Sequence, residues 1–172
     1  MTIIKLDTAV LFRQLDETTT LLLKLIESTA EKFIHVIPFA NSWTVAQLAS
    51  HVTKSIKGIA QALEMPGQQS VRSADERVQE LKKMFLDFNI KFQSPEFILP
   101  TITIHSKKEV IKKVEEAVEQ LKAMRSKADL TEVINLPAFG EITKFELLNF
   151  VVFHTQRHIH QLKTMLNYLQ AA

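Results

Sequence analysis

Apolar side chains recur at intervals of three and four residues along most of this chain, and no other feature constrains its fold as strongly. This spacing places the apolar residues on one face of an α-helix. It predicts helices over about residues 7–32, 44–63, 74–92, 107–126 and 143–169. Each helix must bury its apolar face against another element, so we predict an all-α protein, a four-helix bundle with long connecting loops.

The low content of glycine and proline agrees with long uninterrupted helices. The chain has 172 residues but only 3 glycines and 5 prolines, whereas a turn-rich β protein needs more of both. This length predicts a single domain over residues 1–172. The stretch 96–104 is apolar and β-branched with a proline inside it, so we expect a packed loop with a short extended piece.

Two of the predicted helices begin with a capping box. Thr44 followed by Gln47, and Thr143 followed by Glu146, have the spacing at which the two side chains satisfy the first free backbone N–H groups of a helix. Both pairs directly precede apolar periodic segments.

Charge and composition exclude several classes of function. A net charge of +2 gives no excess that would attract nucleic acid or an anionic membrane. The start of the chain lacks the apolar run of about seven residues that a signal peptide needs, and no run approaches the length of a membrane span. The absence of cysteine removes disulfides and thiolate ligands. We expect a soluble cytoplasmic protein with no nucleic-acid or membrane partner.

His154 and His158 are the most informative polar residues, because they lie four positions apart in the last predicted helix. They continue the apolar face that passes through Leu147 and Val151, so both should point into the bundle. Burying two imidazoles costs free energy unless their nitrogens find partners. A shared metal ion would satisfy one nitrogen of each ring. The alternative is a pair of core histidines hydrogen-bonded to carbonyls or carboxylates.

His51, in the second predicted helix, is the best candidate for a third ligand. Ser55 and Gly58 are small neighbours at helical spacing, which leaves room for a ligand but equally eases helix packing. Three imidazoles around one ion are typical of catalytic zinc sites with an open position, but nickel and iron also accept imidazoles, so the ligand set does not name the metal. Thr155 stands where the metalloprotease motif needs glutamate, so we do not expect a metalloprotease. His160 falls on another face of its helix.

Two segments carry a resemblance to a known family. Trp-Thr-Val-Ala-Gln-Leu-Ala-Ser-His at 43–51 and His-Thr-Gln-Arg-His-Ile-His-Gln at 154–161 resemble the second-helix and last-helix signatures of the DinB/YfiT-like superfamily. The resemblance implies a four-helix bundle with a mononuclear divalent metal site. Carried over residue by residue, the metal ligands are His51, His154 and His158.

The resemblance also bears on activity. Related members are thiol S-transferases that use bacillithiol, mycothiol or glutathione, or a mycothiol-dependent maleylpyruvate isomerase, and dimers are common among them. It therefore implies a metal-dependent transferase, hydrolase or isomerase acting on a small molecule, with zinc or nickel and a low-molecular-weight thiol as cofactors. A homodimer stays open, and no residue identifies a particular thiol.

Three further residues are candidates for contacts with the ligands or the substrate, namely Gln47, Arg157 and Gln161. For Gln47 the alternative is a capping role, and for Arg157 it is a structural ion pair. Two other functions stay open for the chain as a whole. One is a non-catalytic bundle that uses the metal for stability or for sensing a ligand. The other is a helical interaction module without metal, which requires imidazoles too far apart to share an ion.

Overall fold

The computed structural model describes residues 6–100 and 105–171. Its helices and strands follow in this order: α1 Thr8–Ser28, the 3₁₀ turn η1 Glu31–Phe33, α2 Val45–Glu64, β1 Gln68–Gln69, α3 Val78–Leu86, the 3₁₀ turn η2 Glu96–Ile98, α4 Lys107–Arg125, β2 Glu132–Leu136, β3 Gly140–Thr143 and α5 Lys144–Ala171. No helix in the described ranges is both long enough and apolar enough to cross a membrane.

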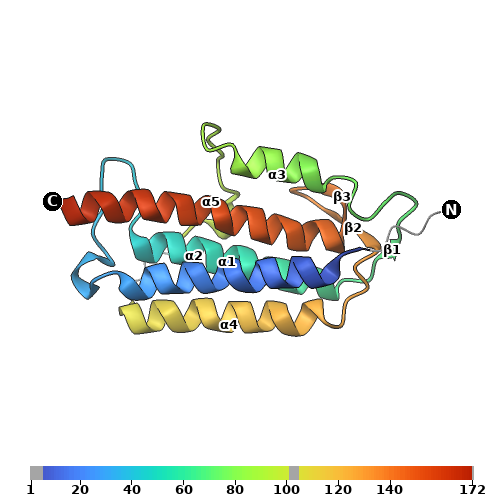
Figure 1. Ribbon diagram of the computed structural model, residues 1–172, viewed down its shortest axis with the longest axis horizontal. Helices are drawn as coiled ribbons and strands as arrows, with labels where there is room; N and C mark the ends of the chain where they lie inside the picture. The colour runs from blue at the N-terminus through green and yellow to red at the C-terminus, as the bar shows by residue number, and fades with distance from the viewer. Residues whose placement is uncertain (1–5, 101–104, 172) are drawn as a thin grey trace.

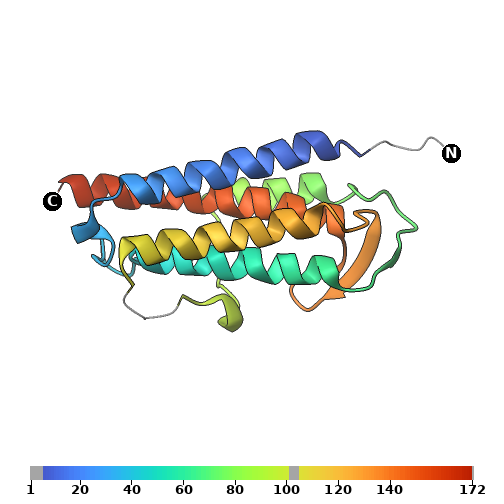
Figure 2. The ribbon, with the colours of Figure 1, turned by 90° about the horizontal axis from the view of Figure 1, so that it is seen from below.

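The four long helices α1, α2, α4 and α5 lie side by side and form the bundle (Figures 1 and 2). Both α1 and α2 pack against α4 and α5, which closes the ring of helices. Helices α2 and α4 run in the same direction, because α3 and its two long connections carry the chain back along the bundle between them (Figure 1). The core contains a completely buried residue from each of α1, α2, α4 and α5, namely Leu22, Leu48, Val114 and Leu162. The predicted four-helix bundle with long connecting loops is thus confirmed.

Both predicted capping boxes are present. The Thr44 hydroxyl accepts the N–H of Gln47 at 3.2 Å, and Gln47 Oε1 accepts the N–H of Thr44 at 2.9 Å. At the start of α5, the Thr143 hydroxyl accepts the N–H of Glu146 at 3.1 Å, while the Glu146 carboxylate accepts the N–H of Thr143 at 2.9 Å. These bonds fix the first turns of the two helices that carry the histidines.

The third helix is shorter than the predicted range 74–92. Its first turn forms where the carboxylate of Glu146, from another helix, accepts the N–H of Arg77 at 2.8 Å. Its end coincides with a local turn in which Asp87 Oδ1 accepts the N–H of Asn89 at 3.0 Å. Such side-chain bonds to the backbone compete with the helix. The helical period alone could not reveal either limit.

The first helix also ends earlier than predicted, at Ser28, and η1 follows it. The apolar stretch 96–104, expected to be a packed loop, begins as the 3₁₀ turn η2, in which Phe97 is 71% exposed. Residues 101–104 of that stretch, like the first five residues of the chain, lie outside the described part.

A small three-stranded antiparallel sheet in the order β1-β2-β3 was not predicted. Strands β2 and β3 form a hairpin in which Ile134 pairs with Ile142 and Leu136 with Gly140. Gly140 has a φ of +65°, a left-handed conformation that glycine adopts without strain. The hairpin leads directly into α5 at one end of the bundle (Figure 1).

Candidate metal centre

The three histidines singled out in the sequence meet in the core between α2 and α5. Nε2 of His154 lies 3.2 Å from Nε2 of His51 and 3.1 Å from Nε2 of His158. The candidate ligand atoms of the three residues all lie within 4.8 Å of one another. Their exposed fractions are only 1% for His51, 6% for His154 and 7% for His158. An interaction module without metal required imidazoles too far apart to share an ion, and the three imidazoles are not so far apart.

The other ring nitrogen of two of these histidines has a hydrogen-bond acceptor. Nδ1 of His51 donates to the carbonyl oxygen of Ile98 at 2.8 Å, and Nδ1 of His158 donates to Oε1 of Gln161 at 3.0 Å. Neutral imidazole has one proton, so these partners assign it to Nδ1 in both rings. Nε2 of His51 and Nε2 of His158 then present lone pairs toward Nε2 of His154.

The converging nitrogens fit a metal ion better than they fit one another. If the single proton of neutral His154 is on Nε2, it can be donated fully to only one of the two facing lone pairs. A cation between the three atoms accepts all three lone pairs at once, and three imidazoles with neighbouring hydrogen-bond acceptors are a common donor set for zinc. The buried cluster could therefore hold a metal ion.

The surroundings keep the three imidazoles neutral. Burial lowers the pKa of His51, and the charge of Lys54 lowers it further, although the bond to Ile98 opposes this. Burial, together with the neighbouring histidines and Arg157, holds the pKa of His154 well below its usual range. Burial lowers the pKa of His158 to about 3. Protons therefore do not compete for these nitrogens near neutral pH.

Aromatic rings enclose the cluster. The ring of Trp43 lies 5.0 Å from that of His51 and 6.5 Å from that of His158. Phe150 stacks on His154 with ring centroids 5.0 Å apart, and Phe85 of α3 meets the same ring edge-on at 6.1 Å. The sequence indicated Trp43 only as the first residue of the second-helix signature and gave no role to Phe85 or Phe150. The spacing of four between Phe150 and His154 was a usable signal, whereas the contact with α3 was not.

The three additional candidates have different surroundings. Gln161 accepts from His158, whereas the side-chain oxygen of Gln47 is bound in the capping box of α2. Arg157 donates from Nη1 to the carbonyl oxygens of Phe85 at 3.2 Å and Asp87 at 2.9 Å. Its guanidinium is thus bound to the backbone at the end of α3.

Two neighbours of the ligands on α5 take no part in the cluster. His160 is exposed and stacks on Phe88 at 3.9 Å, as its different helical face predicts. Thr155 is completely buried, and its hydroxyl has no hydrogen-bond partner among the described residues. A hydroxyl cannot replace the carboxylate base of a metalloprotease.

A second buried polar cluster, here called the carboxylate cluster, lies at the start of α5. The Glu146 side chain is fully buried and binds both terminal nitrogens of Arg72, at 2.6 and 2.7 Å. It also accepts the N–H groups of Thr143 and Arg77. Burial alone would raise the pKa of Glu146, but these donors and the charge of Arg72 outweigh it and lower the pKa.

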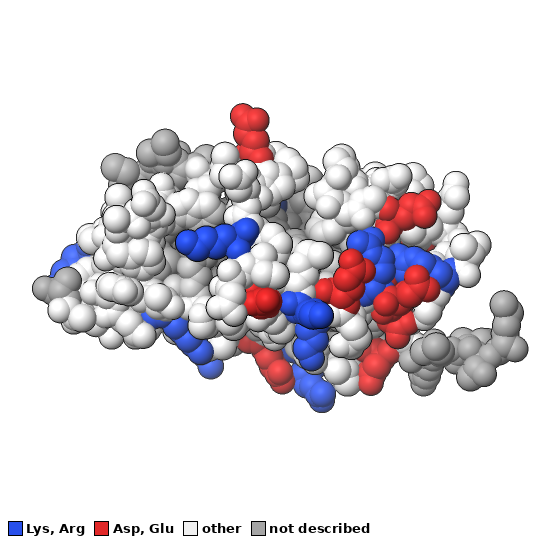
Figure 3. Space-filling model, turned by 90° about the horizontal axis from the view of Figure 1, so that it is seen from above, with Lys and Arg blue, Asp and Glu red and all other residues white. Residues whose placement is uncertain are grey.

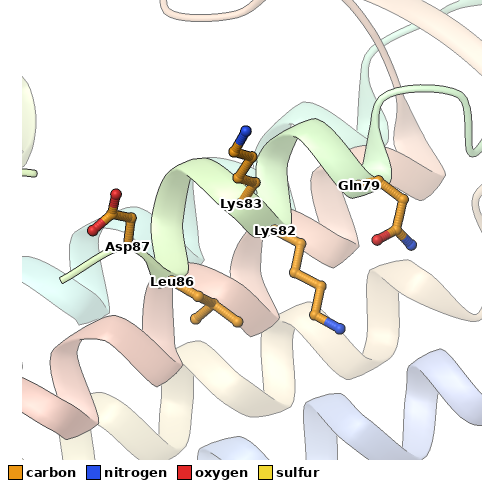
Figure 4. Close-up of a pocket in the computed structure, with 5 residues that line it drawn as sticks. All are labelled: Gln79, Lys82, Lys83, Leu86 and Asp87. Atoms are coloured by element: carbon orange, nitrogen blue, oxygen red, sulfur yellow. The ribbon is translucent and has the colours of Figure 1, made fainter.

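A surface hollow on α3 is separate from the histidines. Gln79, Lys82, Lys83, Leu86 and Asp87 line it (Figure 4). None of these five lining residues is buried, so we assign the hollow no chemistry.

The protein is thus a four-helix bundle with a buried cluster of three histidines between two of its helices, and this cluster could hold a metal ion. The chain belongs to the DinB superfamily, whose family model matches residues 14–162. No curated protein matches the chain in sequence.

Two solved structures have the same fold. YfiT from Bacillus subtilis, a probable metal-dependent hydrolase with an unusual four-helix bundle topology, is 16% identical, with a TM-score of 0.60 over 99% of this chain and 91% of that chain. TT2238, a four-helix bundle protein, is 18% identical, with a TM-score of 0.60 over 91% of this chain and 98% of that chain. At these identities the likeness establishes the fold alone.

Proposed function

We propose that this protein is a metal-dependent enzyme in which His51, His154 and His158 bind one divalent ion, zinc or nickel, and that it acts on a small molecule. The observation that carries the proposal is the convergence of three Nε2 atoms, two of them lone-pair donors whose Nδ1 protons are bound elsewhere. Hydrolysis is the favoured reaction class, because YfiT, which shares the fold, is described as a probable metal-dependent hydrolase.

The residues around the ligands suit catalysis more than simple storage of an ion. In the described ranges, no aspartate or glutamate joins the group of three histidines, so three neutral ligands leave the positive charge of a divalent ion uncompensated. Lys54 and Arg157 add positive charge nearby. Held by these three histidines, a divalent ion would lower the pKa of a bound water or thiol and so supply a nucleophile near neutral pH.

The chain's own residues would orient the ligands. The Ile98 carbonyl and Gln161 hold His51 and His158 in the tautomer that directs Nε2 inward. The surrounding rings of Trp43, Phe85 and Phe150 limit the access of bulk water, which strengthens electrostatic interactions inside the site. A low-molecular-weight thiol as co-substrate, the transferase reaction implied by the resemblance, would bind the same ion.

One alternative has a specific observation in its favour. The three imidazoles are at most 7% exposed, as expected for a non-catalytic bundle in which the ion serves stability or ligand sensing. In that case the protein binds metal but turns over no substrate.

The first test is the metal content of protein purified without a histidine tag, measured by inductively coupled plasma mass spectrometry. We expect one zinc or nickel ion per chain in the wild type and in His35→Ala, a control at an exposed histidine. His154→Ala and His158→Ala should lose the ion. A wild type that neither contains nor takes up zinc or nickel would falsify the proposal.

The second test separates the enzyme from the non-catalytic alternative. Metal-loaded and chelator-treated protein is assayed against ester and amide substrates, and against electrophiles together with bacillithiol, mycothiol or glutathione. Saturable turnover that disappears in His154→Ala supports the enzyme. Bound metal without any saturable turnover supports the sensing or structural role instead.

A further inference from the structure

The metal centre is closed, so something must move before a ligand reaches it. Its imidazoles are between 1% and 7% exposed. His154 is covered by Phe150 and Phe85. Phe150 is one turn away on the same helix and is itself buried, whereas Phe85 belongs to α3, which lies outside the bundle (Figure 1).

The end of α3 is attached to α5 through Arg157. Its guanidinium donates to the carbonyl oxygens of Phe85, Asp87 and Ile90 and lies 4.8 Å from the ring centroid of Phe92. Carbonyls at a helix end have no partner within the helix, so one planar group with several donors can bind them together. Arg157 lies between the two histidine ligands of α5.

The segment 85–92, here called the α3 end segment, begins with Phe85 and Leu86 packed against the core, and its residues 88–92 are exposed. Phe88, Ile90 and Phe92 are 45%, 41% and 43% exposed. Seen from the side on which α3 lies, uncharged atoms cover much of the face, and the largest group of charged side chains is toward the sheet end (Figure 3). Segments with few buried contacts open locally at the lowest free-energy cost.

We propose that Arg157 is a positioning residue that holds the α3 end segment, with Phe85 at its start, closed over His154, so that its release opens the path to the metal centre. The inference rests on the proposed metal site and concerns access to it. The other covering groups have attachments of their own. Trp43 precedes the capping box of α2, and η2 is tied by His51 and by Lys54, which donates to the Leu99 carbonyl at 2.6 Å.

The test compares the kinetics of metal exchange with the equilibrium affinity. Zinc uptake and chelator-driven zinc release are followed with a colorimetric indicator for the wild type, Arg157→Ala and Arg157→Lys. We expect both rates to rise about tenfold in Arg157→Ala, the size expected from losing hydrogen bonds to a charged group. In Arg157→Lys, which keeps the positive charge beside the site, the Kd should stay within about twofold. Its exchange rates should rise similarly, because an ammonium cannot replace the planar fork.

Arg125 provides a matched control on α4. It binds the Phe12 carbonyl and the Asp16 carboxylate and lies 4.5 Å from the Phe12 ring centroid. Arg125→Ala removes the same kinds of contact away from the histidines, so it should lower stability without changing either exchange rate. If Arg157→Ala weakens zinc binding while the uptake rate is unchanged, Arg157 only supports the site and the proposal is overturned.

Hydrogen–deuterium exchange gives a readout that does not depend on metal. In Arg157→Ala the amides of segment 85–92 should exchange faster, while those of α5 around His154 and His158 stay protected. If Arg157→Ala folds poorly, Phe92→Ala is a second variant that leaves the arginine in place. It should give a smaller increase in the exchange rate of segment 85–92. Absence of zinc uptake by the wild type would count against the proposed function, whereas unchanged exchange of segment 85–92 would count against this inference.

Discussion

Helix α5 carries two buried polar clusters that differ in how their polar atoms are paired. In the carboxylate cluster, Glu146 has partners for its charge in Arg72 and in two backbone N–H groups, all supplied by the chain. In the histidine cluster, the three Nε2 atoms face one another and lack enough protons to satisfy every lone pair. The carboxylate cluster thus finds all its partners within the chain, whereas the histidine cluster could be completed by a ligand.

The largest expected effect comes from breaking the complete cluster. Arg72→Ala leaves the fully buried Glu146 carboxylate without its counter-charge, and we expect a loss of about 3–5 kcal/mol in the free energy of unfolding. Urea unfolding measures it. Arg13→Ala, which breaks the exposed pair with Glu17, should cost less than about 1 kcal/mol. Equal losses in the two variants would contradict the assigned role of Glu146.

The next effect comes from completing the incomplete cluster. Zinc at about 100 times its Kd should add about 2.7 kcal/mol to the wild-type free energy of unfolding, because only the folded chain brings the three nitrogens together. Thermal unfolding with zinc and with chelator measures the shift. His154→Ala should abolish it and Glu146→Gln should retain it. A zinc shift that survives in His154→Ala would mean that the ion binds elsewhere.

A smaller effect tests how the histidine cluster is held. Gln161→Leu removes the acceptor for Nδ1 of His158, and loss of such a partner weakens metal affinity by about tenfold or more. Competition with a chromogenic chelator measures it. Gln47→Leu is the matched control, since that glutamine is bound in the capping box. It should reduce helix stability and leave the zinc affinity unchanged, and equal losses of affinity would refute this distinction.

The smallest effect concerns acid. Folding lowers the pKa of Glu146 from its ordinary value of 4.5. As the pH falls, the carboxylate is therefore protonated in the unfolded chain before it is protonated in the folded protein. The stability that the carboxylate contributes is therefore complete above about pH 4.5 and is lost below it. Urea midpoints between pH 7 and about pH 3 should fall less steeply for Glu146→Gln than for the wild type. Identical slopes for Glu146→Gln and the wild type would contradict the prediction.

The two clusters also differ in how far the sequence disclosed them. The three histidines were predicted as one set, because their residue type, their spacing on α5 and the two family signatures all pointed the same way. Glu146 was predicted only as a capping residue. Its partner Arg72 is 74 positions away in an irregular segment, and helical periodicity says nothing about contacts of that kind.

The same limit explains the parts of the fold that were missed. The limits of helices with a strong apolar period, such as α2 and α4, were predicted almost to the residue. The extent of α3 depends on bonds from Glu146 and Arg157 on another helix, and the β2–β3 hairpin is too short to show a clear alternation. Long-range hydrogen bonds set these features, whereas local patterning set the helices.

Trp43, the single tryptophan of the chain, lies within ring-contact distance of two of the three histidines. All the tryptophan fluorescence of this protein therefore originates beside the three histidines. An open-shell ion such as Ni²⁺ bound there should quench that emission, while closed-shell Zn²⁺ should leave it bright. The unmodified protein thus carries its own optical reporter of what the histidines bind.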